Sequence, residues 1–92
     1  MTVRLIVGMK AAVGKREDLV ATFASLCPSV REEPGCQQYE LYQSTERPDQ
    51  FVLLERWFDQ DTLTVHSQRL RERGVDMTSL RVGPSEVERF TE

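Results

Sequence analysis

Three segments of the chain alternate between apolar and polar residues with the period of two that is typical of β-strands. They are Thr2 to Lys10, Cys36 to Gln43 and Phe51 to Phe58. The second and third are separated by Ser44 to Gln50, whose Arg-Pro-Asp sequence favours a turn, so we expect them to form a hairpin. A fourth strand is expected to begin at Pro84 or just after it and to run to Phe90.

Two other segments place apolar residues three and four positions apart, which is the spacing of an amphipathic helix. The first runs from Lys15 to Glu32. Pro28 lies within it and removes one backbone donor, so we expect a kink near Ala24. The second helix is expected to begin after Asp59, a residue that can cap a helix, and to end at Gly74.

The predicted order of elements is strand, helix, strand, strand, helix, strand, which is the split βαβ arrangement of ferredoxin-like folds. We therefore expect the α+β fold class, with a four-stranded antiparallel sheet that carries both helices on one face. A chain of 92 residues has no room for a second domain, so residues 1–92 are expected to form a single one.

The strand from Phe51 to Phe58 is apolar on both faces. Phe51, Leu53, Glu55 and Trp57 point to one side, and Val52, Leu54, Arg56 and Phe58 point to the other. Two helices cover only one face of a four-stranded sheet, and an open apolar face usually marks an interface. We expect the sheet to pack against a second copy of the chain as a homodimer. The alternative is that these apolar residues are simply tolerated at the surface.

Composition and charge narrow the possible partners. Hydrophobic residues make up 39% of the chain and charged residues 29%, and the net charge is −3, so no broad basic surface is available for nucleic acid or anionic lipid. No apolar run has the length of a membrane span or a secretory signal, so a cytoplasmic location is expected. Cys27 and Cys36, with one histidine in the chain, predict neither a zinc site nor a disulfide framework.

Three segments carry a characteristic pattern when they are taken together. They are Gly14-Lys15-Arg16-Glu17-Asp18-Leu19, Arg31-Glu32-Glu33-Pro34-Gly35-Cys36, and Phe51-Val52-Leu53-Leu54-Glu55-Arg56-Trp57 followed nine residues later by His66. In order and spacing they resemble the antibiotic biosynthesis monooxygenase family, and the resemblance extends over nearly the whole chain. It implies a dimeric α+β barrel, in which two ferredoxin-like sheets pack face to face and each subunit holds a pocket between sheet and helices.

The resemblance also implies a range of activities. Some family members oxidise phenolic or quinol compounds with molecular oxygen and use neither flavin nor metal, so we expect no cofactor. Others degrade haem, act on small carbonyl signalling molecules, or have no established reaction. Haem-degrading members carry an Asn where this chain has Val7, which argues against haem degradation. Some members that oxidise aromatic polyketides carry an Asn where this chain has Leu53.

Three residues are candidates for the chemistry of cofactor-free oxygenation, in which the protein binds an electron-rich ring and removes its hydroxyl proton. Trp57 is expected to wall the pocket, and His66 is the candidate base, because the ordinary pKa of histidine, about 6.5, lies near neutrality. Glu55 faces the helices and is a rival base if burial raises its pKa. The alternatives are that Trp57 only packs in the core, that His66 bonds a backbone carbonyl, and that Glu55 pairs with Arg4 or Arg56.

A further four residues are expected to bind the substrate. Tyr39 is preferred to Tyr42, because the two tyrosines project to opposite faces of their strand and Tyr39 pairs better with the apolar side. The substrate-binding candidates are Tyr39, Leu53, Met9 and Phe23. The expected ligand is a small aromatic or hydrophobic compound. A non-catalytic dimer of the same fold, which binds a small ligand or serves in assembly, is the alternative function.

Overall fold

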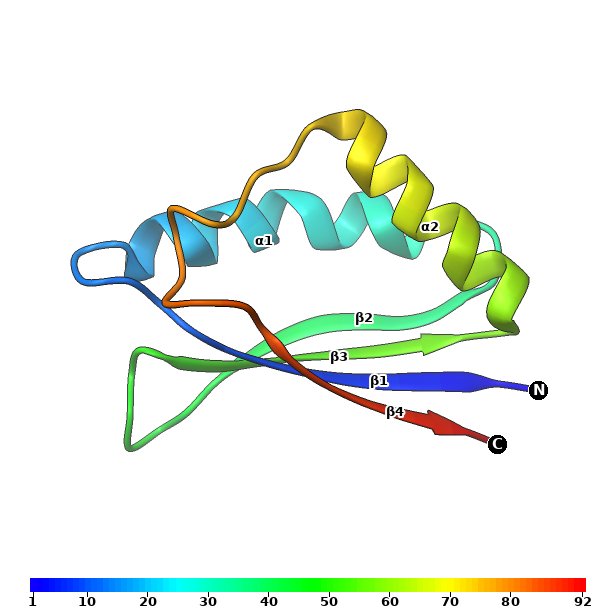
Figure 1. The fold of residues 1–92 in the computed structure, drawn as a ribbon, viewed down its shortest axis with the longest axis horizontal. Helices are drawn as coiled ribbons and strands as arrows, with labels where there is room; N and C mark the ends of the chain where they lie inside the picture. The colour runs from blue at the N-terminus through cyan, green and yellow to red at the C-terminus, as the bar shows by residue number, and fades with distance from the viewer.

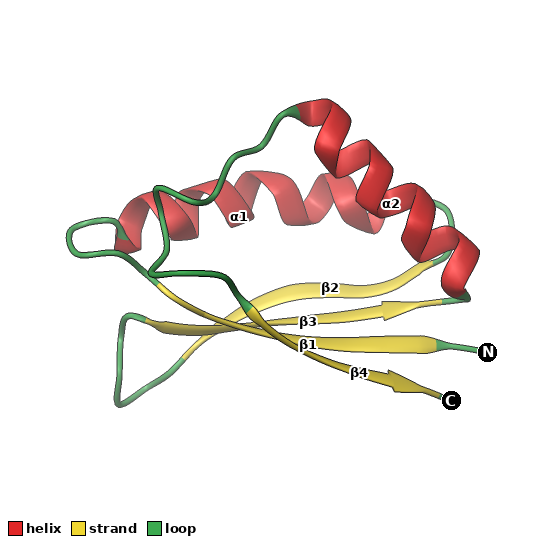
Figure 2. Ribbon diagram, in the orientation of Figure 1, coloured by secondary structure: helices red, strands yellow, loops and turns green.

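The computed structural model describes residues 1–92 as six elements. They are β1 (Val3–Lys10), α1 (Arg16–Arg31), β2 (Cys36–Gln43), β3 (Gln50–Trp57), α2 (Gln60–Arg73) and β4 (Glu86–Thr91). The strands form one antiparallel sheet in the order β2-β3-β1-β4. Both helices lie on the same face of this sheet (Figure 1), so the molecule has one helical and one strand layer (Figure 2). The predicted ferredoxin-like α+β fold is confirmed.

The strand register decides which side chains face the helices. Glu55 of β3 lies opposite Leu5 of β1 on one side and Tyr39 of β2 on the other. Because successive side chains of a strand point to opposite faces, these residues and their alternate neighbours form the helix-covered face. Leu54, one residue away, lies on the open face opposite Ile6.

The hydrophobic core lies between the sheet and α1. The stripe predicted for α1 supplies five buried residues, which are Leu19, Phe23, Leu26, Cys27 and Val30. Trp57 of β3 and Tyr39 of β2 are the largest fully buried side chains beneath the helices. Burying one large apolar side chain stabilises the fold by about 1.5–3 kcal/mol, so this layer holds α1 on the sheet. The helix continues without interruption past Pro28 to Arg31.

The start of α2 is fixed by a capping box and by a close approach of the loop between α1 and β2. The Asp59 side chain accepts a hydrogen bond from the Thr62 N–H at 2.9 Å, as the sequence predicted for a cap at Asp59. Gly35, with a φ of +82°, packs so tightly here that a Cβ would lie 2.5 Å from the Thr62 side chain. Only glycine meets both conditions without strain.

The chain returns from α2 to the sheet through a long loop that ends in the edge strand β4. The strand begins at Glu86, two residues later than Pro84, and it pairs only with β1. All six of its residues are exposed. The ends of the chain lie side by side, because the Thr2 N–H donates to Glu92 O and the Glu92 N–H donates to Thr2 O. Neither helix has the length and apolar character that crossing a membrane requires.

Candidate active site

A cavity of about 360 Å³ lies between α2 and the helix-covered face of the sheet. Its volume is at the small end of the range for pockets that take small molecules, and its lining is mainly apolar. The lining residues are Leu5, Val7, Met9, Phe23, Tyr39, Leu53, Glu55, Leu63, His66, Ser67, Leu70, Met77, Arg81, Ser85 and Val87. Three larger hollows lie beside the β2–β3 turn, between α1 and β2, and at the start of α2. None of them contains His66, Glu55 or Trp57.

Six of the seven predicted site residues line this one cavity. They are Met9, Phe23, Tyr39, Leu53, Glu55 and His66. Trp57 is not among the lining residues, and the expectation that it walls the pocket is corrected, because its side chain is fully buried behind His66. Tyr42 lies on the other face of the sheet and is 48% exposed, so of the two tyrosines only Tyr39 lines the cavity, as preferred from the sequence.

The His66 imidazole is held on three sides. Its ring stacks on the Trp57 indole with a centroid distance of 4.6 Å, and the edge of Tyr39 lies 5.3 Å away. Its Nδ1 lies 3.1 Å from Glu33 Oε1. The alternative that His66 bonds a backbone carbonyl is therefore wrong, because its partner is a buried carboxylate. The ring cannot turn without losing this hydrogen bond and the stacking, so its orientation toward the cavity is fixed.

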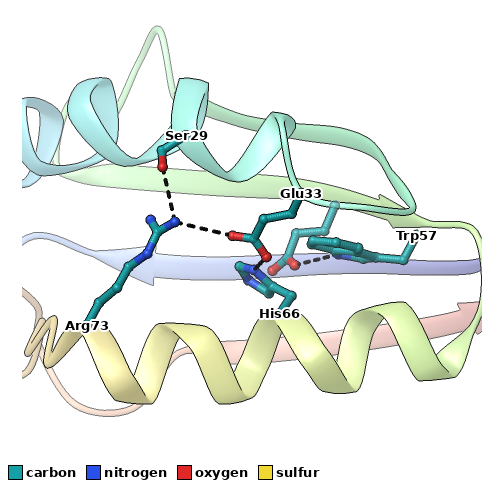
Figure 3. A network of polar contacts seen from close by, with 6 residues as sticks. Ser29, Glu33, Trp57, His66 and Arg73 are labelled. Atoms are coloured by element: carbon teal, nitrogen blue, oxygen red, sulfur yellow. Dashed lines mark hydrogen bonds and ion pairs between the residues drawn. The ribbon is translucent and has the colours of Figure 1, made fainter.

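Glu33 is a site residue that sequence reasoning missed. It follows α1, within the segment from Arg31 to Cys36 that was used above only for the family resemblance, and it is buried. Its second oxygen lies 3.5 Å from the Arg73 guanidinium of α2, and Arg73 also donates to Ser29 Oγ at 3.0 Å (Figure 3). The carboxylate thus joins the end of α1 to two residues of α2. A charged residue where the apolar stripe of α1 would continue, three positions after Val30, was the available signal.

The contact with Glu33 determines which nitrogen of His66 can act as a base. A carboxylate accepts hydrogen bonds, so Nδ1 carries the proton and donates it to Glu33. The lone pair of a neutral imidazole is then on Nε2. This carboxylate–imidazole arrangement can accept a proton at Nε2 and stabilise the cation that results.

Glu55 is the second titratable group of the cavity. The Trp57 indole N–H donates to Glu55 Oε1 at 3.0 Å. Burial raises the pKa of the Glu55 carboxyl, and the indole bond and His66 offset only part of that effect. The predicted pairing of Glu55 with Arg4 or Arg56 is wrong, because both arginines lie on the opposite face of the sheet and bond Gln38 and Glu92.

Burial also keeps one tyrosine and both cysteines neutral. Burial is also the main cause that raises the pKa of the Tyr39 hydroxyl, which therefore remains a hydrogen-bond donor at neutral pH. The Cys27 thiol is buried with a raised pKa, and burial raises the pKa of the Cys36 thiol to about 11. Both cysteines are free thiols and poor nucleophiles at neutral pH. No three His, Cys, Asp or Glu side chains come together in a way that could hold a metal ion.

Comparison with known families supplies the classification. The family model described as antibiotic biosynthesis monooxygenase matches residues 2–71. The chain belongs to the antibiotic biosynthesis monooxygenase family. The matched span contains Glu33, Glu55, Trp57 and His66, so the family resemblance predicted from the sequence is confirmed over the part of the chain that forms this network.

Relatives of this antibiotic biosynthesis monooxygenase domain share both sequence and fold. The Bacillus subtilis (strain 168) protein named "Putative monooxygenase YcnE" is 30% identical over 66 residues, which cover 72% of this chain and 70% of that protein. The structure of PA3566 from Pseudomonas aeruginosa is 25% identical with a TM-score of 0.87, and covers 99% of this chain and 93% of its own. The structure of Rv0793 from Mycobacterium tuberculosis is 25% identical with a TM-score of 0.88, and the match covers 100% of this chain and 95% of the Rv0793 chain.

Proposed function

We propose that the protein is a cofactor-independent monooxygenase that oxidises a small phenolic or quinol compound with O2 in the cavity beneath α2. The observation that carries this proposal is the His66 imidazole at the cavity wall, with its Nδ1 bonded to the buried Glu33 carboxylate. A proton acceptor fixed in this way beside an apolar cavity suits the removal of a phenolic proton. Membership of a monooxygenase family supports the same reaction class.

The reaction begins with proton transfer from the substrate hydroxyl to His66 Nε2. The resulting phenolate is electron-rich and reduces O2 itself, so the protein need not store electrons. For a phenol with a free para position, one oxygen atom forms the new carbonyl of a quinone. The second oxygen atom leaves as water together with the hydroxyl proton and the ring hydrogen. Phenol and O2 thus give quinone and water, and the substrate supplies all four electrons.

The residues around the cavity have separate roles in this proposal. Glu33 stabilises the imidazolium that forms when His66 takes the proton. The Tyr39 hydroxyl is a donor for the oxyanion that develops on the substrate, and Glu55, whose pKa burial raises, is the second titratable group beside it. Phe23, Leu53 and Met9 supply an apolar lining that excludes water from the reactive anion.

Oxygen consumption by the purified, metal-stripped and flavin-free protein tests the proposal. The substrates are hydroquinones, naphthoquinols and anthrones, and the variant is His66→Ala. We expect uptake above the uncatalysed rate and a loss of about 10²- to 10⁴-fold in His66→Ala, as is typical of a general base. Arg69→Ala, on the exposed side of α2, is the control and should retain the wild-type rate. Equal rates for wild type and His66→Ala would exclude the base.

A non-catalytic ligand-binding protein of the same fold is the second candidate, and the apolar lining of the cavity favours it. In that case a compound from the panel raises the melting temperature in proportion to RT ln(1 + [L]/Kd), and no oxygen is consumed. The two functions are therefore separated by running both measurements on the same compounds.

We further propose that the open face of the sheet packs against a second copy of the chain. Leu54 lies opposite Ile6 in the middle of this face, and Tyr42 lies opposite Val52. Tyr42 and Phe90 are each about half exposed. No helix of the chain covers these side chains (Figure 1), and a second sheet would remove them from water.

A further inference from the structure

Arg81 occupies the end of the cavity that is farthest from the proposed base. Its backbone forms an isolated antiparallel bridge with Ala11, just beyond the end of β1. The Ala12 N–H donates to Leu80 O at 2.9 Å, and the Val82 N–H donates to Lys10 O at 2.8 Å. These two bonds fix the backbone on either side of Arg81, and its side chain lines the same cavity as His66 and Glu55.

The Nε of the Arg81 guanidinium lacks a hydrogen-bond partner within the protein. It is buried from solvent, and it is the one buried side-chain nitrogen or oxygen in this condition. The Thr78 hydrogen bonds and, as a smaller cause, the Arg81 charge lower the pKa of Asp76. No carboxylate lies within ion-pair distance of Arg81, whereas Arg16, Arg56 and Arg73 each pair with one. A buried donor on a charged group is costly unless an acceptor meets it, so its position indicates an acceptor that the chain does not supply.

The cavity therefore has two polar ends with an apolar middle. Glu55 lies opposite Leu5 of β1, and Arg81 lies opposite Ala11. Six residues of strand, or about 20 Å of backbone, separate these positions, and both side chains extend into the cavity between them. Val7 and Met9 line the wall from the intervening part of β1. The proton-transfer groups lie at one end and the cation at the other.

We propose that the ligand is a compact hydroxylated aromatic carboxylate, whose carboxylate pairs with Arg81 while its hydroxyl points to His66. The placement of the ligand hydroxyl at His66 rests on the proposed function, and the placement of its carboxylate rests on Arg81. A planar carboxylate can accept from Nε–H and a second guanidinium N–H at once. The opposite orientation would place a carboxylate against Glu55 and leave Arg81 unpaired.

Equilibrium binding under anaerobic conditions tests this inference, because it requires no turnover. The probes are a series of hydroxybenzoates and hydroxynaphthoates, each compared with its uncharged parent phenol. We expect the best acid to bind at least about tenfold more tightly than its parent, since a hydrogen bond to a charged group is worth about one to two powers of ten in affinity. Arg81→Gln should abolish this preference, because it weakens binding of the acid far more than binding of the parent phenol.

Two control variants separate pairing from general charge and from structure. Arg69→Gln removes the same charge from the exposed side of α2 and should leave the preference for acids intact. Arg81→Met keeps an unbranched apolar stem and should not lower the melting temperature of the ligand-free protein, because it removes an unpaired donor. A lower melting temperature together with weaker binding of the parent phenols would assign Arg81 to the structure and overturn the inference.

Further results of the binding and oxygen-uptake experiments also decide whether Arg81 binds the ligand carboxylate. Equal affinity for acids and parent phenols, failure of every acid to bind at millimolar concentration, or an unchanged preference in Arg81→Gln would each overturn the inference. A protein that binds the acids through Arg81 and consumes no oxygen would retain the inference and contradict the monooxygenase proposal. Oxygen uptake with uncharged phenols and no preference for acids would support the monooxygenase proposal and contradict the inference about Arg81.

Discussion

The Trp57 indole stacks on the His66 imidazole with ring centroids 4.6 Å apart and an interplanar angle of 29°. The same indole donates its N–H to Glu55 at 3.0 Å. One fully buried aromatic side chain therefore contacts both His66 and Glu55, which line the cavity, and holds them in position. Trp57 acts as a positioning residue for them and is not a surface for the ligand.

Glu33→Gln is expected to lower turnover about 10²-fold or more. A glutamine amide can donate to His66 Nδ1, which moves the ring proton to Nε2 and removes the lone pair that faces the substrate. Oxygen-uptake kinetics should show a lower kcat with little change in KM. Arg73→Gln is the matched control, because Arg73 is one-third exposed and pairs with the Glu33 oxygen that does not bond His66. A similar loss in both variants would contradict the tautomer argument.

Glu55→Gln is expected to stabilise the protein at neutral pH. Burial raises the Glu55 pKa above its ordinary value of 4.5, so folding favours the protonated carboxyl. This contribution is fully present below about pH 4.5 and is lost as the pH rises through the folded-state pKa. Glutamine keeps an acceptor for the Trp57 N–H and does not ionise. The free energy of unfolding of Glu55→Gln should therefore exceed that of the wild type by an increasing amount as the pH rises from about 4.5 through the folded-state pKa.

Urea denaturation of both proteins between about pH 4 and about pH 8 measures this difference. Glu88→Gln, on the exposed edge strand, is the control and should show no comparable change with pH. A Glu55→Gln protein whose advantage stays constant from acid to neutral pH would show that burial does not raise the Glu55 pKa.

Gly35→Ala is expected to destabilise the protein by about 2–4 kcal/mol. Its positive φ costs a side chain about 1–2 kcal/mol, and the new Cβ would lie 2.5 Å from Thr62, where overpacking costs about 1–3 kcal/mol. Gly14 also has a positive φ, at +75°, but a Cβ there would meet nothing within 4 Å. Gly14→Ala should therefore destabilise the protein only by the cost of the positive φ, about 1–2 kcal/mol. Equal losses by denaturant titration would show that the Thr62 contact is unimportant.

Leu54→Glu is expected to convert a dimer into a monomer. The wild type should sediment at micromolar concentration with twice its chain mass of 10.6 kDa. A carboxylate in the middle of the open face would be left without a partner on burial in the interface. Val65→Glu, at an exposed position of α2, is the matched control and should remain a dimer. A monomeric wild type would exclude the proposed interface.

The fold could be predicted because local periodicity encodes it. The alternation of β3 placed Glu55 and Trp57 beneath the helices, and helical spacing from Leu63 placed His66 over the sheet. The same alternation puts Arg4 and Arg56 on the opposite face, so it already contradicted their pairing with Glu55. Charge alone suggests either arginine as a partner for Glu55, but the face of the sheet on which each side chain lies excludes both.

The partners that complete the site could not be predicted in this way. Glu33 and His66 are 33 residues apart and meet only when α1 and α2 lie together on the sheet. Arg81 follows a long loop whose path no periodic pattern describes. Its unpaired Nε is a property of the folded surroundings and has no counterpart in the sequence.

The edge strand gives the cavity its most easily opened wall. Val87 lines the cavity, yet the backbone of β4 pairs only with β1, the Arg89 side chain bonds Gln60 of α2, and none of the six residues of β4 is buried. Regions with few buried contacts open at the lowest free energy, so amides of β4 should exchange with deuterium well before those of β1 and β3. Fraying of this strand would break the Arg89–Gln60 bond to α2 and uncover the Val87 side of the cavity, so the exchange rate of the β4 amides measures how easily this wall opens.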